Sequence, residues 1–270
     1  MEVYYLTLIL GVLFGGLDIG LNWFTVWSLV RFPFWVLGTM LAGFIVYWIV
    51  MGAFCLPIDM KKEYDRPNPF YLDLIRYTFG YGLTIFGFRV KLIGEEKIPA
   101  NTRFLVTANH TTAFDPLIVC HALRKFDIVF ITKPENYKIP IIRRYMHACR
   151  HLPIDRDDPR KAIKTINEAA DMIASDVVSV GIFPEGTRSR DGRTGEFKPG
   201  SYKIAQKAKS PVVLLAIKGG KNFKKNFPFK LTPIEVVVER VLTPEEVGSM
   251  KTVEIAALSE SLVKAELGEA

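Results

Sequence analysis

The sequence predicts an α/β protein with a mostly parallel or mixed central sheet flanked by helices, preceded by an N-terminal hydrophobic helical hairpin. From Phe88 onward, short apolar segments alternate with helical stretches, as in proteins whose helices pack on a largely parallel sheet. Residues 1–59 are apolar and carry a net charge of −2, whereas residues 60–270 carry a net charge of +9. This division excludes a simple soluble protein with a single core, and an apolar content of 49% excludes a disordered chain.

The N-terminal segment has the length and composition of membrane helices. Residues 32–58 carry no charge and exceed the roughly 20 residues that a spanning helix requires. Residues 3–30 form a weaker stretch, interrupted by Asp18 and four glycines, so residues 3–17 could instead form a short helix in one leaflet. We expect a turn between the two helices at Phe32–Pro33. The alternative is a helical hairpin buried in a large core.

The boundary between the two parts is expected at residues 59–69, so that residues 1–59 form membrane-anchoring helices and residues 60–270 a separate domain. Lys61, Lys62 and Arg66 follow the apolar segment, which by the positive-inside rule places the domain on the cytoplasmic side of the cell membrane. Cys55, Cys120 and Cys149 are odd in number and far apart, which excludes a disulfide scaffold and fits a reducing compartment.

The elements expected in the second part follow from the alternation of apolar strands and helical stretches. The expected strands cover residues 88–92, 103–108, 127–131, 178–183, 212–217 and 234–239, with a further short strand at 150–154. The expected helices cover residues 116–124, 140–148, 158–174, 200–208 and 244–266. Because residues 177–183 and 212–217 are almost continuously apolar, we expect them to be buried central strands. Residues 70–88 are rich in aromatic residues and could form either a helix at the lipid headgroups or a core helix that covers the sheet.

The first candidate catalytic group follows the predicted strand 103–108. His110 lies in a loop, and Asp115 precedes Pro116, which suits an N-cap followed by proline at the first helical position. A turn could bring Asp115 to one ring nitrogen of His110 and leave the other nitrogen as a base. The alternative is a carboxylate that only caps the helix beside a histidine without a catalytic role.

The second candidate group follows the predicted strand 178–183. Pro184 and Gly186 indicate a sharp turn, and the planar guanidinium groups of Arg188 and Arg190 suit bidentate phosphate binding. Glu185 could accept hydrogen bonds from a polyol; the alternative is a turn with solvated charges.

Arg156 follows the short apolar run at 150–154 and could also bind phosphate, although its alternative is an ion pair with Asp155, Asp157 or Asp158. Each of the three groups lies just past the end of a predicted strand. Since ligands bind at strand ends in open α/β sheets, we expect one shared cleft.

These blocks together resemble the glycerolipid acyltransferase superfamily, and most closely the bacterial 1-acylglycerol-3-phosphate (lysophosphatidic acid) acyltransferases. The resemblance covers about residues 85–220. The matching blocks are residues 109–115 (NHTTAFD), 154–156 (IDR), 183–189 (FPEGTRS) and, in part, 211–215 (PVVLL). It implies a glycerol-3-phosphate-acyltransferase-like fold in the catalytic domain and helices that seat this domain in a leaflet.

The resemblance also implies the roles of the site residues. His110 would be the general base for the sn-2 hydroxyl of 1-acyl-glycerol-3-phosphate, supported by Asp115. The donor would be acyl-CoA or acyl carrier protein, and the product would be phosphatidic acid for phospholipid biosynthesis. The groups implied to bind the glycerol phosphate are Arg156, Glu185, Gly186, Thr187 and Arg188. A thioester is already activated, so no metal or cofactor is expected, and His121, His147 and His151 are expected to be structural.

Three alternatives remain open from the sequence. The acceptor could be glycerol-3-phosphate or another lysophospholipid. A non-catalytic, basic membrane- or lipid-binding protein would explain the charge, but not the joint presence of His110, Asp115 and residues 185–188; no nucleic-acid partner is expected. A metal-dependent hydrolase has weak support, since the blocks lack a second histidine at metal-binding spacing. Residues 218–230 interleave five lysines with three phenylalanines, which suits either an interfacial loop or a solvated one.

Overall fold

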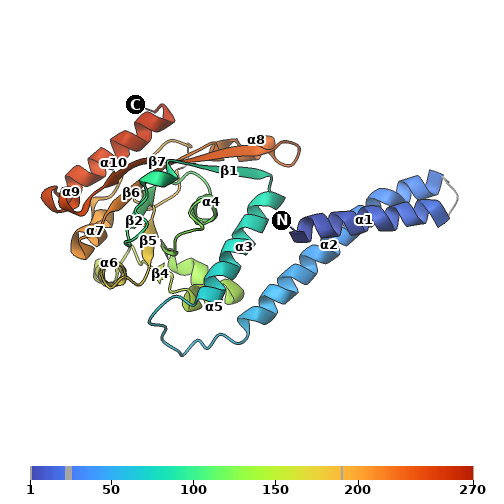
Figure 1. Cartoon of the computed structure of the whole chain (residues 1–270), viewed down its shortest axis with the longest axis horizontal. Helices are drawn as coiled ribbons and strands as arrows, with labels where there is room; N and C mark the ends of the chain where they lie inside the picture. Colours follow the sequence, from blue (N-terminus) through green and yellow to red (C-terminus); the bar gives the residue numbers. More distant parts are fainter. Residues whose placement is uncertain (1, 22–25, 190, 270) are drawn as a thin grey trace. The chain divides into compact units, whose positions relative to one another are not determined.

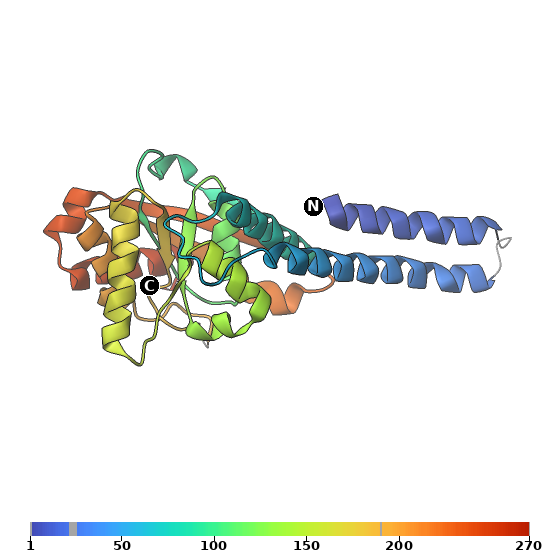
Figure 2. The same ribbon diagram turned by 90° about the horizontal axis from the view of Figure 1, so that it is seen from below.

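The computed structural model describes residues 2–21, 26–189 and 191–269. The chain divides into two compact units, Met1–Asp59 and Met60–Ala270. The first unit consists of helices α1 (Glu2–Leu21) and α2 (Val26–Cys55), which lie side by side as a hairpin (Figure 2).

The expected turn at Phe32–Pro33 is wrong, because Pro33 lies inside α2. Proline removes one hydrogen bond and costs about 3 kcal/mol within a helix, but the apolar sequence on both sides supports a continuous helix of 30 residues. Within the described residues, Trp27–Cys55 is the one helix long and apolar enough to cross a membrane, and Leu6–Leu21 is a shorter apolar helix.

Asp18, Gly11 and Gly15, which interrupt the first apolar stretch in the sequence, belong to the helix–helix contact. The Asp18 carboxylate forms an ion pair with Arg31 of α2 at 3.3 Å, so neither charge stands alone in an apolar environment. A side chain at Gly11 would collide with Thr39 and Val36 of α2, which shows how closely the two backbones approach. Small residues permit such an approach in apolar helix pairs.

The second unit is built on a seven-stranded mixed sheet with helices on both faces (Figure 1). The strands are β1 (Phe88–Ile93), β2 (Leu105–Ala108), β3 (Ile128–Thr132), β4 (Leu152–Pro153), β5 (Ser179–Ile182), β6 (Val212–Lys218) and β7 (Thr232–Leu242). Their order is β1-β7-β6-β2-β5-β3-β4. The five strands from β6 to β4 run in one direction, while β7 is antiparallel to β6 and parallel to β1. The predicted fold class is confirmed.

The helices divide into two groups that cover opposite faces of the sheet. They are α3 (Pro69–Ile85), α4 (Asp115–Ala122), α5 (Pro140–Ala148), α6 (Pro159–Ala174), α7 (Lys203–Ala208), α8 (Phe223–Asn226), α9 (Pro244–Ser249) and α10 (Thr252–Leu267). Helices α3 and α4 contribute to one core, and α6, α7, α9 and α10 contribute to the other. Residues of β6 alternate between the two cores and are buried on both faces, as the continuous apolar run predicts.

Helix 244–266, expected as one element, is two helices. Met250 and Lys251 adopt extended backbone conformations between α9 and α10. Each helix has its own start: Glu246 accepts the Thr243 N–H at 2.8 Å, and Glu254 accepts the Lys251 N–H at 2.7 Å. Because a carboxylate satisfies a free N–H group at each start, a second helix can begin within eight residues of the first.

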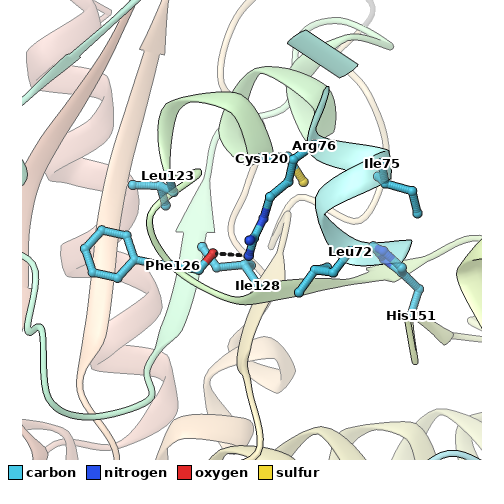
Figure 3. A pocket seen from close by; sticks show the side chains of 8 residues that line it. All are labelled: Leu72, Ile75, Arg76, Cys120, Leu123, Phe126, Ile128 and His151. Atoms are coloured by element: carbon cyan, nitrogen blue, oxygen red, sulfur yellow. Dashed lines mark hydrogen bonds between the residues drawn. The ribbon is translucent and has the colours of Figure 1, made fainter. Parts of the chain in front are cut away.

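Helix α3 packs on the domain core, which is one of the two roles proposed for residues 70–88. Leu72, Ile75, Tyr81 and Leu83 are buried toward the domain, whereas Phe70 and Tyr77 are exposed. Its buried face borders a cavity of about 10 Å³ together with α4 and β3, shown in Figure 3. There Arg76 donates to the Phe126 carbonyl at 2.7 Å. This volume is at the lower limit for one water molecule, so the cavity is not a substrate site.

Candidate active site

The candidate site lies at the edge of the sheet where β6, β2 and β5 end. These three neighbouring strands are parallel, so their carboxyl ends meet at one edge. His110 follows β2, the middle strand; Glu185 and Arg188 follow β5, and Gly219 follows β6. The fold therefore brings two of the predicted blocks together around a central histidine.

The His110 ring and the Asp115 carboxylate form a hydrogen bond, with 2.9 Å between Nδ1 and Oδ2. Asp115 is fully buried, and the His110 side chain is 17% exposed. An ionised carboxylate only accepts hydrogen bonds, so Nδ1 carries the proton and Nε2 holds the free lone pair. This is the protonation pattern of a general base.

Asp115 is not the N-cap that the sequence suggested. It is the first residue of α4, and the N-cap position is occupied by Phe114, which makes no capping bond through its side chain. The carboxylate turns back to the loop instead: Oδ2 accepts the N–H groups of Thr111 at 2.6 Å and Thr112 at 2.7 Å, and Oδ1 accepts the Thr112 hydroxyl at 2.6 Å. These bonds fold the five-residue spacing into a turn, which overturns the alternative of a carboxylate that only caps the helix.

Glu185 fixes the backbone of His110 from the neighbouring strand end. Its Oε1 accepts the His110 N–H at 2.7 Å, and its Oε2 accepts the Gly195 N–H at 3.1 Å. The Ser189 N–H donates to the His110 carbonyl at 2.9 Å, which ties the two loops together a second time. Burial raises the pKa of the Glu185 carboxyl above its usual value, and the two N–H bonds oppose this rise. Both carboxylate oxygens are thus engaged within the protein, in contact with the backbone of the candidate base.

The aromatic support of His110 was not predicted from the sequence. The His110 ring stacks on Phe183, with 4.3 Å between ring centroids and 24° between planes. Phe183 in turn stacks on Phe130 of β3 at 5.9 Å. Phe183 stands at the start of the FPEGTRS block, so its position directly after a buried strand was the available signal. Together with the bond to Asp115, this contact restricts the ring to one orientation.

The turn after β5 presents cationic groups to solvent. Gly186 has φ +77°, a left-handed conformation that favours glycine, and the Nζ of Lys198 lies close to it. Thr187 and Arg188 are exposed, and Arg188 has no ion-pair partner in the described part of the chain. Ser189, the next residue, contacts the His110 backbone, which places Arg188 beside the histidine loop. Arg190 lies outside the described residues.

Arg156 lies farther along the same edge, just past β4. Strands β5 and β3 lie between β2 and β4. The three spacings between these neighbouring strands, at about 4.8 Å each, place β4 about 14 Å from β2. Arg156 is exposed, and no ion pair forms between it and its acidic neighbours among the residues described. Asp155 and Asp158 pair with Lys161 instead, and Asp158 caps α6. The alternative that Arg156 is neutralised by an adjacent aspartate is therefore wrong.

Helix α10 and Glu269, which follows it, hold the segment after the turn, a contact that the sequence did not reveal. The Thr194 N–H donates to Glu269 at 2.8 Å, and the Phe197 N–H donates to Glu260 at 2.8 Å. With Gly195 bonded to Glu185, three N–H groups in residues 194–197 each meet a carboxylate. The contacts join residues 63 and 75 positions apart, so no local pattern could have shown them.

A pocket of about 420 Å³ lies behind the histidine loop, on the face of the sheet that carries α10. Thr111, Gly220, Lys221 and the end of α10 line it. His110 is not among its lining residues, because its ring packs on Phe183, which belongs to the core on the opposite face. The candidate reaction centre is therefore on the α4 face of the sheet.

Comparison with known proteins identifies the class of this domain. Residues 89–218 match the family model described as Acyltransferase, and this range includes all the site residues named above except Gly219, Gly220, Lys221, Glu260 and Glu269. The region that holds the candidate site therefore matches the acyltransferase family, as its sequence blocks predict.

Several relatives are named 1-acyl-sn-glycerol-3-phosphate acyltransferase. The protein of Chlamydomonas reinhardtii is 34% identical over 163 residues, which cover 59% of this chain and 48% of the relative. The protein of Borreliella burgdorferi is 29% identical over 157 residues, covering 56% of this chain and 59% of the relative. The matched region thus spans about half of these relatives' length.

The fold is similar to the crystal structure of the 1-acyl-sn-glycerophosphate (LPA) acyltransferase PlsC from Thermotoga maritima. The TM-score is 0.61 and the sequence identity 22%, with 99% of this chain and 92% of that chain covered.

Proposed function

We propose that this protein transfers a fatty acyl group from an acyl thioester to the sn-2 hydroxyl of 1-acyl-glycerol-3-phosphate, which yields phosphatidic acid. The observation that carries the proposal is the 2.9 Å bond between His110 Nδ1 and the buried Asp115 carboxylate, next to an exposed arginine turn. The relatives named above support the choice of acceptor.

In the proposed reaction, Nε2 of His110 removes the proton from the acceptor hydroxyl. The resulting alkoxide attacks the thioester carbonyl and forms a carbon–oxygen bond. Collapse of the tetrahedral intermediate breaks the carbon–sulfur bond, and the thiolate takes the proton from His110. The buried Asp115 stabilises the imidazolium while it exists. The mechanism needs no metal or other cofactor, because a thioester is already activated; the donor is acyl-CoA or acyl carrier protein.

The phosphate of the acceptor is assigned to the cations on the β5 and β4 side of His110. Arg188 and Arg156 are both exposed and unpaired in the described structure, which suits groups reserved for an anionic ligand. The exposed Thr187 hydroxyl and the Gly186 turn complete the proposed phosphate-binding surface. Glu185 contributes by holding this turn against His110.

The proposed location is the cell membrane, with the domain on the cytoplasmic side. Helices α1 and α2 anchor the chain, and Trp27–Cys55 has the length and hydropathy for this role. A membrane location gives access to an acceptor and a product that are both lipids.

The test is an acceptor panel with the full chain in detergent or vesicles. Lysophosphatidic acid, glycerol-3-phosphate and lysophosphatidylcholine are each supplied with labelled acyl-CoA and, separately, with acyl carrier protein loaded with the same chain. We expect labelled phosphatidic acid, at a rate lowered by about 10²–10⁴-fold in His110→Ala. His147→Ala is the matched control, because His147 bonds to the Lys62 carbonyl and not to a carboxylate. Equal rates in wild type and His110→Ala would overturn the proposal.

A further inference from the structure

A surface at the end of the domain near α8 remains unexplained by the reaction chemistry. We define the Lys–Phe loop as residues 223–231, which comprise α8 and its connection to β7. Three of its apolar side chains are exposed: Phe229 at 94%, Leu231 at 56% and Phe227 at 39%. Adjacent exposed apolar groups of this size are unusual on a soluble surface and mark contact sites.

The loop is held in place rather than left as an unsupported tail. The Lys230 N–H donates to the Asn226 carbonyl at 2.7 Å, and the Asn226 amide donates to the Leu231 carbonyl at 3.2 Å. The Thr232 N–H then donates to the Gly87 carbonyl at 2.9 Å, which fixes the loop beside the end of α3. Phe86, itself 37% exposed, packs on Phe227 with 5.6 Å between centroids and extends the apolar surface.

The charge around these rings is positive. Lys224, Lys225 and Lys230 are exposed and have no ion-pair partner within the residues that the structure describes, and residues 219–231 contain no acidic residue. Aromatic rings among unpaired lysines complement the headgroup layer of an anionic bilayer, where rings insert and lysines meet phosphates.

The surface connects to the candidate active site through a cluster of phenylalanines. Phe227 packs on Phe223 at 5.4 Å, and Phe223 packs on Phe114 at 5.0 Å. Phe114 is the residue directly before Asp115, the partner of His110. Three phenylalanines in contact, Phe227, Phe223 and Phe114, therefore connect the exposed surface to the residue next to Asp115.

From these observations we infer that the Lys–Phe loop is a second membrane contact, which docks on the headgroup layer of anionic lipid and holds the histidine loop at the bilayer surface. It is separate from the apolar helices α1 and α2. The inference rests on the proposed function in one respect, because a lipid acceptor gives the domain a reason to face the bilayer.

The first test measures the environment of the loop directly. Phe229→Cys is labelled with an environment-sensitive nitrobenzoxadiazole dye in the full chain, reconstituted in phosphatidylcholine vesicles with or without phosphatidylglycerol. The three natural cysteines are buried, which favours selective labelling. We expect a blue shift of the dye that is larger with phosphatidylglycerol. In a Lys224→Gln/Lys225→Gln background, the preference of the protein for vesicles that contain phosphatidylglycerol should weaken about fivefold for each lysine replaced.

The matched control is Val253→Cys, on the first turn of α10, at the opposite end of the domain from α8 (Figure 1). Val253 is 63% exposed, so its label should report water in every vesicle. Equal spectra at positions 229 and 253 would overturn the inference, whether or not the protein is an acyltransferase.

The second test separates docking from chemistry. Phe229→Glu should lower kcat/KM about tenfold for lysophosphatidic acid presented in vesicles and leave a short-chain, water-soluble analogue unaffected. Equal loss on both acceptors would contradict a docking role. Absence of activity in the wild type on every acceptor would refute the proposed function, while the dye measurement would still decide whether the loop meets lipid.

Discussion

Two histidines of this domain lie at opposite ends of parallel strands and show how environment decides chemistry. His110 follows the carboxyl end of β2 and directs Nδ1 to the Asp115 carboxylate. His151 precedes β4, is buried, and uses Nδ1 to accept the Phe130 N–H at 3.0 Å. Burial lowers the pKa of His151 to about 4, so this ring stays neutral at physiological pH.

The bonding partner of Nδ1 therefore sets opposite tautomers. In His110 the carboxylate leaves the lone pair on Nε2, while in His151 the backbone donor leaves the proton there. Only the first arrangement supplies a base with a stabilised charged form. The comparison teaches that the partner of the ring, and not the presence of a histidine near a strand end, identifies the candidate catalytic group.

Asp115→Asn should make His110 resemble His151. An amide can donate to Nδ1, which would move the ring proton to Nε2 and remove the base. We expect kcat to fall about 10³–10⁴-fold, as the wrong tautomer cannot accept the hydroxyl proton. The fall in rate is measured by acyl transfer in a single turnover. The control is Asp171→Asn, at an exposed aspartate of α6. Wild-type kcat in Asp115→Asn would contradict the tautomer argument.

Glu185→Gln should loosen the placement of His110 while keeping its tautomer. One of the N–H groups of His110 and Gly195 would then face an amide donor. We expect kcat to fall by up to about 100-fold with little change in acceptor KM, because a small displacement of a base is costly. The shape of the pH–rate profile should persist, which a general loss of folding would not produce. Glu196→Gln is the exposed control, and an unchanged kcat would argue against this positioning role.

Arg188→Ala and Arg156→Ala should separate substrate binding from proton chemistry. Loss of a charge-assisted hydrogen bond should raise KM for the phosphorylated acceptor about tenfold and leave KM for the acyl donor unchanged. Initial rates with each substrate varied in turn provide the measurement. Arg160→Ala, on the first turn of α6, is the matched control. A larger effect on the donor would reverse the assignment of the two substrates around His110.

His151→Asn should leave the reaction rate at neutral pH unchanged and alter stability in acid. Folding lowers the pKa of the His151 imidazole from 6.5 to about 4. Between these two pH values the imidazole is protonated in the unfolded chain and neutral in the folded chain. Stability is then fully present above about pH 6.5 and declines toward pH 4, by about 3 kcal/mol in total. The asparagine carbonyl can accept the Phe130 N–H without titrating.

The measurement for His151→Asn is the urea midpoint of unfolding at pH 7 and pH 5 in constant detergent. The wild type should lose more stability between the two pH values than the variant. Parallel losses would show that His151 is not the group responsible.

The sequence could predict those features that depend on local pattern. Continuous apolar runs identified the buried strands β5 and β6, and alternation with helices gave the fold class. The order of strand, loop and proline around Asp115 placed His110 and its partner in one turn. In each case the deciding interactions lie within a few residues.

The features of the fold and site that the sequence could not predict depend on contacts between distant residues. Pro33 lies inside α2, which packs along α1, and the charge of Asp18 is compensated by Arg31 on α2. Glu185 looked available for a polyol from the sequence, but its oxygens are engaged by residues from two other segments. Residue spacing alone cannot reveal a partner 75 positions away.

The three carboxylates that hold residues 194–197 give an irregular segment the rigidity usually found in regular structure. Its amide protons at Thr194, Gly195 and Phe197 should exchange with heavy water as slowly as those of a helix, although residues 194–197 belong to no strand or helix. This irregular segment is thus ordered within the folded domain itself, and the entropic cost of ordering it falls in folding and not in ligand binding.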